Sequence, residues 1–301
     1  MISQRVQAVF VVLFVLVIGG VAAVLLTRFE HEPPAAGPKS SSATADSSAK
    51  GPVGGVILSG GTGDLVVRFM TGSCKEPGGP KLELSENRSR TFRQIRIPQV
   101  DDGSGISASS PAVRAIAWAR ATSPTTIEVA AADNTCNVHM YSTTDSGLSW
   151  KQSDNVDVWY KDPLTEGVVS PLGPVDAGCD GVVSVMPITK KTAKVACADG
   201  AFRATSDAGV TWNDSGNLPN TSVAFFTGRQ TGYASVVEDK CKSRIHATVN
   251  GGLTWVPKGC VHKEFVLPGL TGTEKRLVAG GTGGMRLSTD HGATWKIPVK
   301  K

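Results

Sequence analysis

Short runs in which apolar and polar residues alternate recur from about residue 56 to the C-terminus, separated by glycine-rich and polar turns. Alternation with a period of two is typical of strands that bury one face. The runs that predict strands are 65–70, 113–119, 126–132, 182–187, 193–198, 223–226, 233–237, 264–267 and 276–279. The 34 glycines in 301 residues agree with many short strands and tight turns. The pattern therefore predicts an all-β domain over residues 56–301.

An eight-residue pattern returns within this domain with the same order of chemical types. A hydroxyl residue is followed by Asp or Asn, then Gly, then a second hydroxyl residue and Trp. The four near-complete copies are Thr143, Asp145, Gly147, Ser149, Trp150; Thr205, Asp207, Gly209, Thr211, Trp212; Thr248, Asn250, Gly252, Thr254, Trp255; and Ser288, Asp290, Gly292, Thr294, Trp295. A degenerate first copy consists of Ser85, Asn87, Thr91 and Phe92. Because Asp or Asn accepts backbone hydrogen bonds and Gly supplies a positive φ, each copy predicts a rigid turn between two strands.

These residues resemble the Asp-box, or BNR, repeat, whose pattern is Ser/Thr-x-Asp-x-Gly-x-Thr-Trp. In that family the box joins the third and fourth strands of a β-propeller blade, so the resemblance implies a propeller. The family includes sialidases, sortilin-like receptors and the photosystem II assembly factor group. The segment Val223, Phe225, Phe226, Gly232, Tyr233, Ala234 before one box also resembles the repeat of the assembly factor group. Enzymes and non-enzymes share the box, so it indicates architecture and leaves function open.

The closing aromatic residues of the five copies set the number of blades that we expect. They stand at Phe92, Trp150, Trp212, Trp255 and Trp295, with spacings of 58, 62, 43 and 40 residues. The last two spacings suit four-stranded blades, and the first two leave room for additional loops. The repeats predict five blades, with a sixth only if one blade lacks a box.

One long apolar run stands apart from this pattern near the N-terminus. Residues 6–27 are 22 consecutive uncharged positions, which as a helix would measure about 33 Å and would span a hydrocarbon core of about 30 Å. A cleaved signal peptide is the alternative, but its apolar core is normally shorter. We expect a short cytoplasmic segment at 1–5, a transmembrane signal anchor at 6–27 and a flexible Pro-, Ser-, Ala- and Gly-rich linker at 28–55.

The cysteines indicate the compartment. All six, an even number, lie in the predicted propeller, at strand ends or loops opposite the box turns. Their places on the expected blades suggest the pairs Cys74 with Cys136, Cys179 with Cys197, and Cys241 with Cys260. Because disulfides persist outside the cytoplasm, the propeller is expected on the extracytoplasmic side of the plasma membrane, held by a single span.

The composition weakens several other classes of function. The net charge is +5 and no basic run with interleaved aromatic residues occurs, so nucleic-acid binding is not expected. No Cys-x-x-Cys motif occurs and the histidines are scattered, so we expect neither a metal nor a cofactor.

A sialidase is the main enzymatic alternative. Arg96, Ile97 and Pro98 partly match the Phe/Tyr-Arg-Ile-Pro motif of sialidases, but Ile95 replaces the aromatic residue and the stretch follows the degenerate box. The three tyrosines are Tyr141, Tyr160 and Tyr233, and two of them have structural explanations within the repeats. We therefore assign no catalytic residue.

Two long connections on the face opposite the boxes are candidate binding surfaces. Residues 153–177 contain Trp159, Tyr160 and Lys161, an aromatic pair beside a charge that would suit a partner or glycan if exposed and that otherwise packs against its own blade. The second loop, 99–111, contains Asp101 and Asp102. The sequence predicts a membrane-anchored, non-catalytic interaction or assembly module whose partner is an unidentified envelope protein or glycan. A sialidase-like exo-glycosidase and a cell-wall lectin are the alternatives.

Overall fold

The computed structural model describes residues 56–60, 64–75, 79–98, 113–281 and 284–299. These residues belong to one compact unit, Lys50–Lys301, and their regular structure is β-strand. In this part of the chain no helix is long and apolar enough to cross a membrane. The expected anchor at 6–27 and the linker at 28–55 lie outside the described residues, as do Asp101 and Asp102.

The strands form six antiparallel sheets, each built from consecutive strands. Blade 1 has β1 (Val56–Gly60), β2 (Val66–Met70), β3 (Lys81–Ser85) and β4 (Arg93–Ile95). Blade 2 has β5 (Ala115–Ala121), β6 (Ile127–Ala132), β7 (Val138–Thr143) and β8 (Lys151–Ser153). Blade 3 has β9 (Tyr160–Lys161), β10 (Val168–Ser170) and β11 (Gly173–Val175). Blade 4 has β12 (Val182–Pro187), β13 (Ala193–Cys197), β14 (Ala201–Thr205) and β15 (Asn213–Asn217). Blade 5 has β16 (Thr221–Phe226), β17 (Gly232–Glu238), β18 (Cys241–Thr248) and β19 (Val256–His262). Blade 6 has β20 (Gly269–Thr273), β21 (Arg276–Gly281) and β22 (Gly284–Ser288).

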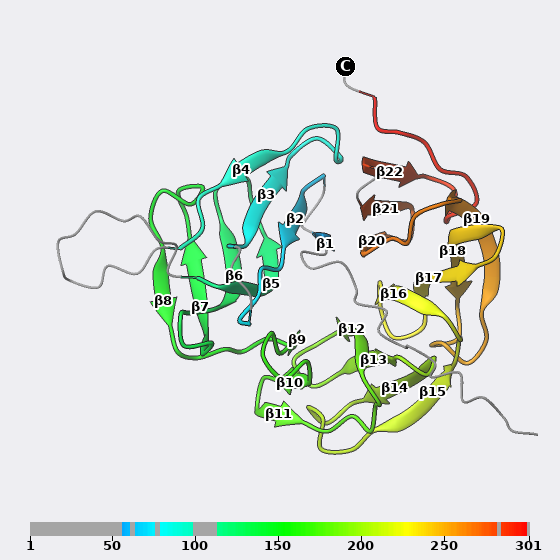
Figure 1. Cartoon of the computed structure of the whole chain (residues 1–301), viewed down its shortest axis with the longest axis horizontal. Helices are drawn as coiled ribbons and strands as arrows, with labels where there is room; N and C mark the ends of the chain where they lie inside the picture. The colour runs from blue at the N-terminus through cyan, green and yellow to red at the C-terminus, as the bar shows by residue number, and fades with distance from the viewer. Residues whose placement is uncertain (1–55, 61–63, 76–78, 99–112, 282–283, 300–301) are drawn as a thin grey trace, which may run out of the picture. The chain divides into compact units, whose positions relative to one another are not determined.

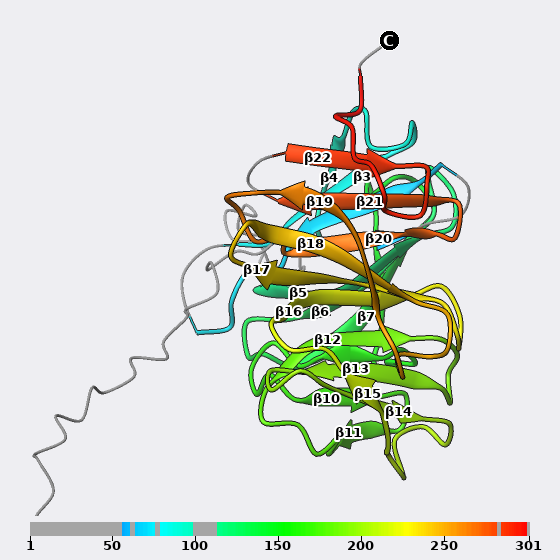
Figure 2. The same ribbon diagram turned by 90° about the vertical axis from the view of Figure 1, so that its right-hand side faces the viewer.

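The six sheets close into a ring, which confirms the β-propeller (Figure 1). The first strand of each sheet is the innermost, and β1 of blade 1 lies against β20 of blade 6. Figure 2 gives the perpendicular view, in which the strands of blades 5 and 6 lie across the picture one above another. Asp64 of blade 1 reinforces the closure, because its carboxylate accepts a hydrogen bond at 2.7 Å from Arg276 of blade 6. Arg88 of blade 1 donates to the same carboxylate at 2.8 Å.

The prediction of five blades is wrong, because blade 3 lacks a box. Its three strands come from the segment 153–177, which the repeat spacing predicts as a long connection. The strands have only two or three residues each, too few for a visible alternation of apolar and polar side chains. A turn in which Asp162 accepts hydrogen bonds from the amides of Leu164 and Thr165 joins β9 to β10.

The box turns are held by side-chain hydrogen bonds within each copy. In blade 4, the Thr205 hydroxyl donates to Asp207 at 2.7 Å and accepts from the Gly209 amide at 3.0 Å. Asp207 also accepts from the Thr211 amide at 3.0 Å and the Thr211 hydroxyl at 2.7 Å. The turns at Asp145 and Asp290 repeat these contacts, and Asn87 and Asn250 occupy the same place with a side-chain amide that donates to the following threonine.

Most box turns also contact the preceding blade. The Trp150 indole donates to the carbonyl oxygen of Arg96, which follows β4, at 3.0 Å, and the Gly259 amide of β19 donates to the Gly292 oxygen at 2.8 Å. At Gly252, where φ is +100°, an added Cβ would lie 2.7 Å from the backbone oxygen of Ser215 in β15. At Gly209, an added Cβ would lie 2.8 Å from the Val175 side chain of β11. Each such box therefore fixes its own hairpin against the neighbouring sheet.

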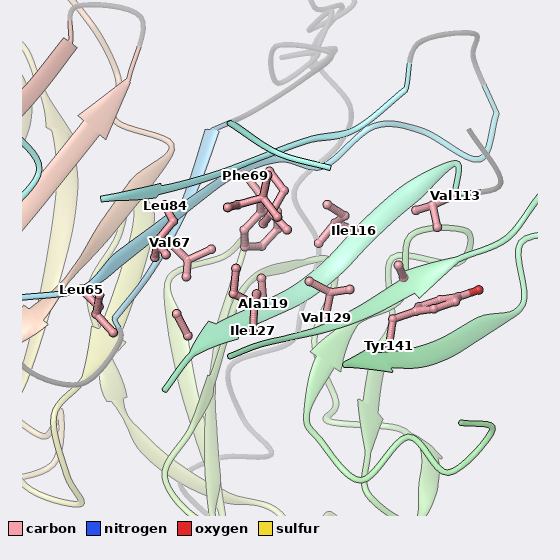
Figure 3. Packing of buried hydrophobic residues seen from close by; sticks show 14 residues of the cluster. Leu65, Val67, Phe69, Leu84, Val113, Ile116, Ala119, Ile127, Val129 and Tyr141 are labelled. Atoms are coloured by element: carbon pink, nitrogen blue, oxygen red, sulfur yellow. The ribbon is translucent and has the colours of Figure 1, made fainter. Parts of the chain in front are cut away.

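Apolar clusters fill five of the six interfaces between blades in the described residues. They lie between blades 1 and 2, 3 and 4, 4 and 5, 5 and 6, and 6 and 1. Figure 3 shows the cluster between blades 1 and 2, where Phe69 and Leu84 face Ile116, Ile127 and Val129. Trp150, Trp212, Trp255 and Trp295 each pack against one of these clusters. Among the described residues, no such cluster lies between blades 2 and 3. Blade 3 is also the blade that has no box.

Three disulfides stabilise the domain, as expected, and they join the expected cysteines. Cys179–Cys197 and Cys241–Cys260 each link two strands or flanking residues of one blade. Cys74–Cys136 joins the β2–β3 connection of blade 1 to the β6–β7 connection of blade 2. It therefore stabilises the interface between blades 1 and 2, which is next to the interface between blades 2 and 3 that has no apolar cluster of described residues.

The box carboxylates predict a specific acid sensitivity. Hydrogen bonds, led by that from the Thr211 hydroxyl, lower the pKa of Asp207 to about 2, and equivalent bonds lower the pKa of Asp145 and Asp290 to about 2. A pKa that is lower in the folded than in the unfolded state contributes stability above the unfolded value of about 4, and that contribution is lost as the pH falls toward about 2. Asp207→Asn removes this carboxylate and gives the turn the residue that the equivalent turn already has at Asn250. We expect the melting temperature of Asp207→Asn to fall less than that of the wild type as the pH is lowered from about 4 to about 2.

Thermal unfolding followed by circular dichroism at several pH values measures this effect. Asp239→Asn, on the exposed β17–β18 turn, is the matched control and should retain the acid sensitivity of the wild type. Identical pH profiles for the wild type and Asp207→Asn would contradict the role of the carboxylate.

Candidate functional site

A cavity of about 1390 Å³ occupies the centre of the ring. Residues of the innermost strands of all six blades line it. On one side the lining continues across the sheet of blade 2 as far as Lys151 and Ser153 of the outermost strand, β8, and includes Trp159, Tyr160 and Lys161 of blade 3. The cavity thus extends outward between these two blades, and we refer to this extension as the 2–3 cleft.

The sheet of blade 2 presents two rows of side chains to this cleft. Strand register places Trp118, Ala130, Met140 and Ser153 side by side in one row, and Arg120, Glu128, Ser142 and Lys151 in the next. Ala130 is fully buried, and the other seven residues line the cavity. The opposite face of the same sheet carries Ile127, Val129 and Tyr141, which pack against blade 1. Because successive side chains of a strand point to opposite faces, the sheet has one apolar face packed against blade 1 and one face with both apolar and polar side chains toward the cleft.

Blade 3 contributes the other wall of the cleft. Trp159, Val168 and Val175 pack toward blade 4, while Tyr160, Val169 and Pro174 are paired in register and belong to the alternate face. Burial first, and the charge of Asp162 second, raise the pKa of Tyr160 to about 12. The phenol therefore remains protonated at neutral pH and can donate or accept a hydrogen bond at the cleft.

The charges around the cavity are mostly paired. Arg120 lies 2.7 Å from Glu128, Lys161 lies 3.3 Å from Glu166, and Lys190 pairs with Asp157. Lys151, Lys275 and Glu274 also line the cavity, and none of the three forms an ion pair with a described residue. The paired groups leave an excess of positive charge at the cavity, and Lys151 places part of it at the outer end of the 2–3 cleft.

Trp118 is the aromatic residue that this geometry identifies. It lies on β5, is half-buried, lines the cavity and has the Arg120 guanidinium 5.5 Å from its ring centroid. Of the six tryptophans, it alone belongs to none of the apolar clusters formed by the described residues. Sequence reasoning missed Trp118, although one signal was present: only Trp118 and Trp159 stand outside the boxes.

Of the two alternatives that the sequence left open for Trp159 and Tyr160, an exposed pair or a packed one, the structure shows the packed one. Trp159 is 2% exposed, its indole donates to the backbone oxygens of Thr189 and Lys190 at 3.1 Å each, and it meets Trp212 edge to face at 6.0 Å. Tyr160 is 8% exposed at the cavity wall. Lys161 lies at the cavity beside Tyr160. The physical reason is that blade 3 is small and uses Trp159 as its main contact with blade 4.

The remaining residues singled out by the sequence lie elsewhere. None of the box residues and none of the cysteines is among the described residues that line the cavity. Arg96 follows β4, is exposed and uses its backbone oxygen to bind Trp150. Arg120 is the single arginine among the described lining residues. No group of three or more His, Cys, Asp or Glu side chains in the described residues could hold a metal ion.

Comparisons with known proteins assign the chain to no family. No protein-family model matches it, and no curated protein matches it. Among solved structures, YCF48 from Cyanidioschyzon merolae is 14% identical, with a TM-score of 0.46 over 74% of this chain and 76% of that one. YCF48 bound to a D1 peptide is 15% identical, with a TM-score of 0.34 over 81% of this chain and 65% of that one. The GH74 enzyme of Niastella koreensis is 11% identical, with a TM-score of 0.32 over 78% of this chain and 45% of that one.

Proposed function

We propose that the propeller is a non-catalytic protein-interaction module that holds a segment of its partner in the central cavity and the 2–3 cleft. One observation carries the proposal: in the described part of the chain, the interface between blades 2 and 3 lacks the apolar cluster found at the other five, and Trp118 lines the space. A half-buried tryptophan at a concave site is the kind of residue that dominates protein interfaces. The five packed interfaces keep the walls of the site rigid.

The lining favours binding over catalysis. A sialidase-type enzyme would need a tyrosine nucleophile activated by a carboxylate, together with several arginines that bind the substrate carboxylate. The raised pKa of Tyr160 opposes formation of a phenolate, and Arg120 is committed to Glu128. The exposed Arg96 lies on the outer side of blade 1, away from the described cavity lining.

We further propose that residues 6–27 anchor the protein in the plasma membrane and that residues 28–55 tether an extracytoplasmic propeller. The three disulfides support this placement, because such bonds are kept oxidised outside the cytoplasm. The uncharged run of residues 6–27 supports the anchor. The partner would then be another component of the cell envelope.

Site-specific photo-crosslinking in living cells tests the proposed function. A benzophenone amino acid at Ser153, in the 2–3 cleft, should capture a discrete partner, and the same group at Val256, exposed on the outer strand of blade 5, should not. Trp118→Ala should abolish most of the capture at Ser153 with little change in melting temperature, because Trp118 belongs to no apolar cluster of the described residues. Equal capture from both positions, or capture that does not depend on Trp118, would refute the assignment of the site.

Binding of a cell-wall glycan is the second candidate, and a specific observation favours it. The face of Trp118 lies beside the paired Arg120 and Glu128, and aromatic faces next to planar hydrogen-bonding groups suit sugar rings. Because Trp159 is buried, Trp118 is the residue whose substitution should be tested in polysaccharide binding. A crosslinked product that is a glycan and not a protein would favour this second function.

A further inference from the structure

We infer that the 2–3 cleft selects an extended peptide segment that carries an apolar side chain and, toward the outer end of the cleft, an acidic one. The inference rests on the proposed function and names the class of segment that the site takes. It follows from the two parallel rows of side chains on blade 2, from the state of their charges and from the size of the cavity.

The row Trp118, Ala130, Met140 offers the apolar contact. These residues lie on three neighbouring strands, β5, β6 and β7, and are paired in register. Trp118 and Met140 are both half-buried, so part of their apolar surface is available in the cleft. Ala130 between them is fully buried and adds no exposed surface, so Trp118 and Met140, which lie two strands or about 10 Å apart, form the two ends of the apolar contact. A leucine-sized or aromatic side chain of a partner would cover it.

The row Arg120, Glu128, Ser142, Lys151 supplies the electrostatic selection. Arg120 and Glu128 neutralise each other at 2.7 Å, and Ser142 is uncharged. Lys151 is exposed and has no ion-pair partner among the described residues. Because β8 is the outermost strand of blade 2, this uncompensated charge lies at the outer end of the row. An acidic side chain of the partner would therefore be favoured there, and a basic one disfavoured.

The dimensions favour a peptide in an extended conformation. The four strands of blade 2 span three interstrand spacings, about 14 Å, which about four or five extended residues would cover. The cavity of about 1390 Å³ exceeds the 300–1,000 Å³ of typical small-molecule sites.

Selection from a displayed library of random peptides of about ten residues, long enough to cross the cleft, tests the inference with the full propeller. The wild type should enrich peptides in which Asp or Glu stands at a constant distance from a Leu, Phe or Trp. Lys151→Glu should shift the enriched charge to Lys or Arg, and Trp118→Ala should remove the apolar preference. Lys263→Glu, an exposed lysine on the β19–β20 connection, is the matched control and should leave the enriched set unchanged.

Binding of one enriched acidic peptide gives the quantitative check. Lys151→Glu should raise the Kd of this peptide about fivefold or more, as expected for loss of an exposed ion pair plus a new repulsion. Added salt should reduce the difference in Kd between the wild type and Lys151→Glu. A wild-type set without acidic residues, a set that Lys151→Glu leaves unchanged, or no enrichment would each overturn the inference. If crosslinking at Ser153 still depends on Trp118 in that case, the proposed function stands and only the class of segment is wrong; if it does not, the proposed function fails as well.

Discussion

Trp159→Ala should lower the free energy of unfolding by about 3–5 kcal/mol, the cost typical of truncating a large buried aromatic side chain. The indole is 2% exposed, packs against Trp212 and lies in the cluster that joins blades 3 and 4. Its removal would also leave the backbone oxygens of Thr189 and Lys190 without their indole donor. Urea unfolding followed by circular dichroism measures the loss.

The same substitution separates a structural role from a binding role. If Trp159 were a ligand anchor, Trp159→Ala would reduce binding and leave stability unchanged. Trp118→Ala is the matched control, because it truncates the same side chain at a half-buried position outside the clusters, and it should cost distinctly less stability. A larger loss for Trp118→Ala than for Trp159→Ala would contradict the described burial of the two residues.

Replacing Cys74 and Cys136 together by serine should lower stability by about 4 kcal/mol, estimated from the chain entropy released by opening a long loop. The two cysteines are 62 residues apart, and their disulfide is the one that joins two blades. The pairs 179–197 and 241–260 close loops of 18 and 19 residues, for which the same relation predicts about 3 kcal/mol each.

Loss of the Cys74–Cys136 disulfide should also reduce the local stability of blade 2. The disulfide holds the β6–β7 connection of blade 2 to blade 1, while the opposite face of blade 2 borders the 2–3 cleft without an apolar cluster in the described residues. We expect hydrogen exchange in the Cys74→Ser, Cys136→Ser variant to rise most in β5–β8, and the Cys179→Ser, Cys197→Ser variant to serve as the control. Uniform acceleration over all blades would contradict a local bracing role.

Some features of this protein could be predicted because short stretches of sequence determine them. In each box the hydroxyl residue, the Asp or Asn and the Gly contact one another within eight residues, so their order alone predicts the turn. Recurrence of the turns then predicted the propeller. Cys179–Cys197 and Cys241–Cys260 were predictable because neighbouring strands of one blade bring fixed positions together, and Cys74–Cys136 because the two cysteines lie in equivalent connections of adjacent blades.

Blade 3 could not be predicted from short stretches of sequence. Its strands have two or three residues and no box, so neither the period of two nor the repeat identifies it. The number of blades depends on whether the ring closes, and closure depends on contacts between β1 and β20 and on the hydrogen bond between Asp64 and Arg276. Residues that are distant in the chain make these contacts.

The two tryptophans outside the boxes give the clearest example of what the sequence can and cannot predict. By itself, the sequence determined that Trp118 and Trp159 have no part in the repeated turn. Only the tertiary structure decided that Trp159 fills the interface between blades 3 and 4 while Trp118 lines the cavity. The physical reason is that burial depends on how two sheets pack: an apolar cluster joins blade 3 to blade 4, whereas no apolar cluster of described residues joins blade 2 to blade 3.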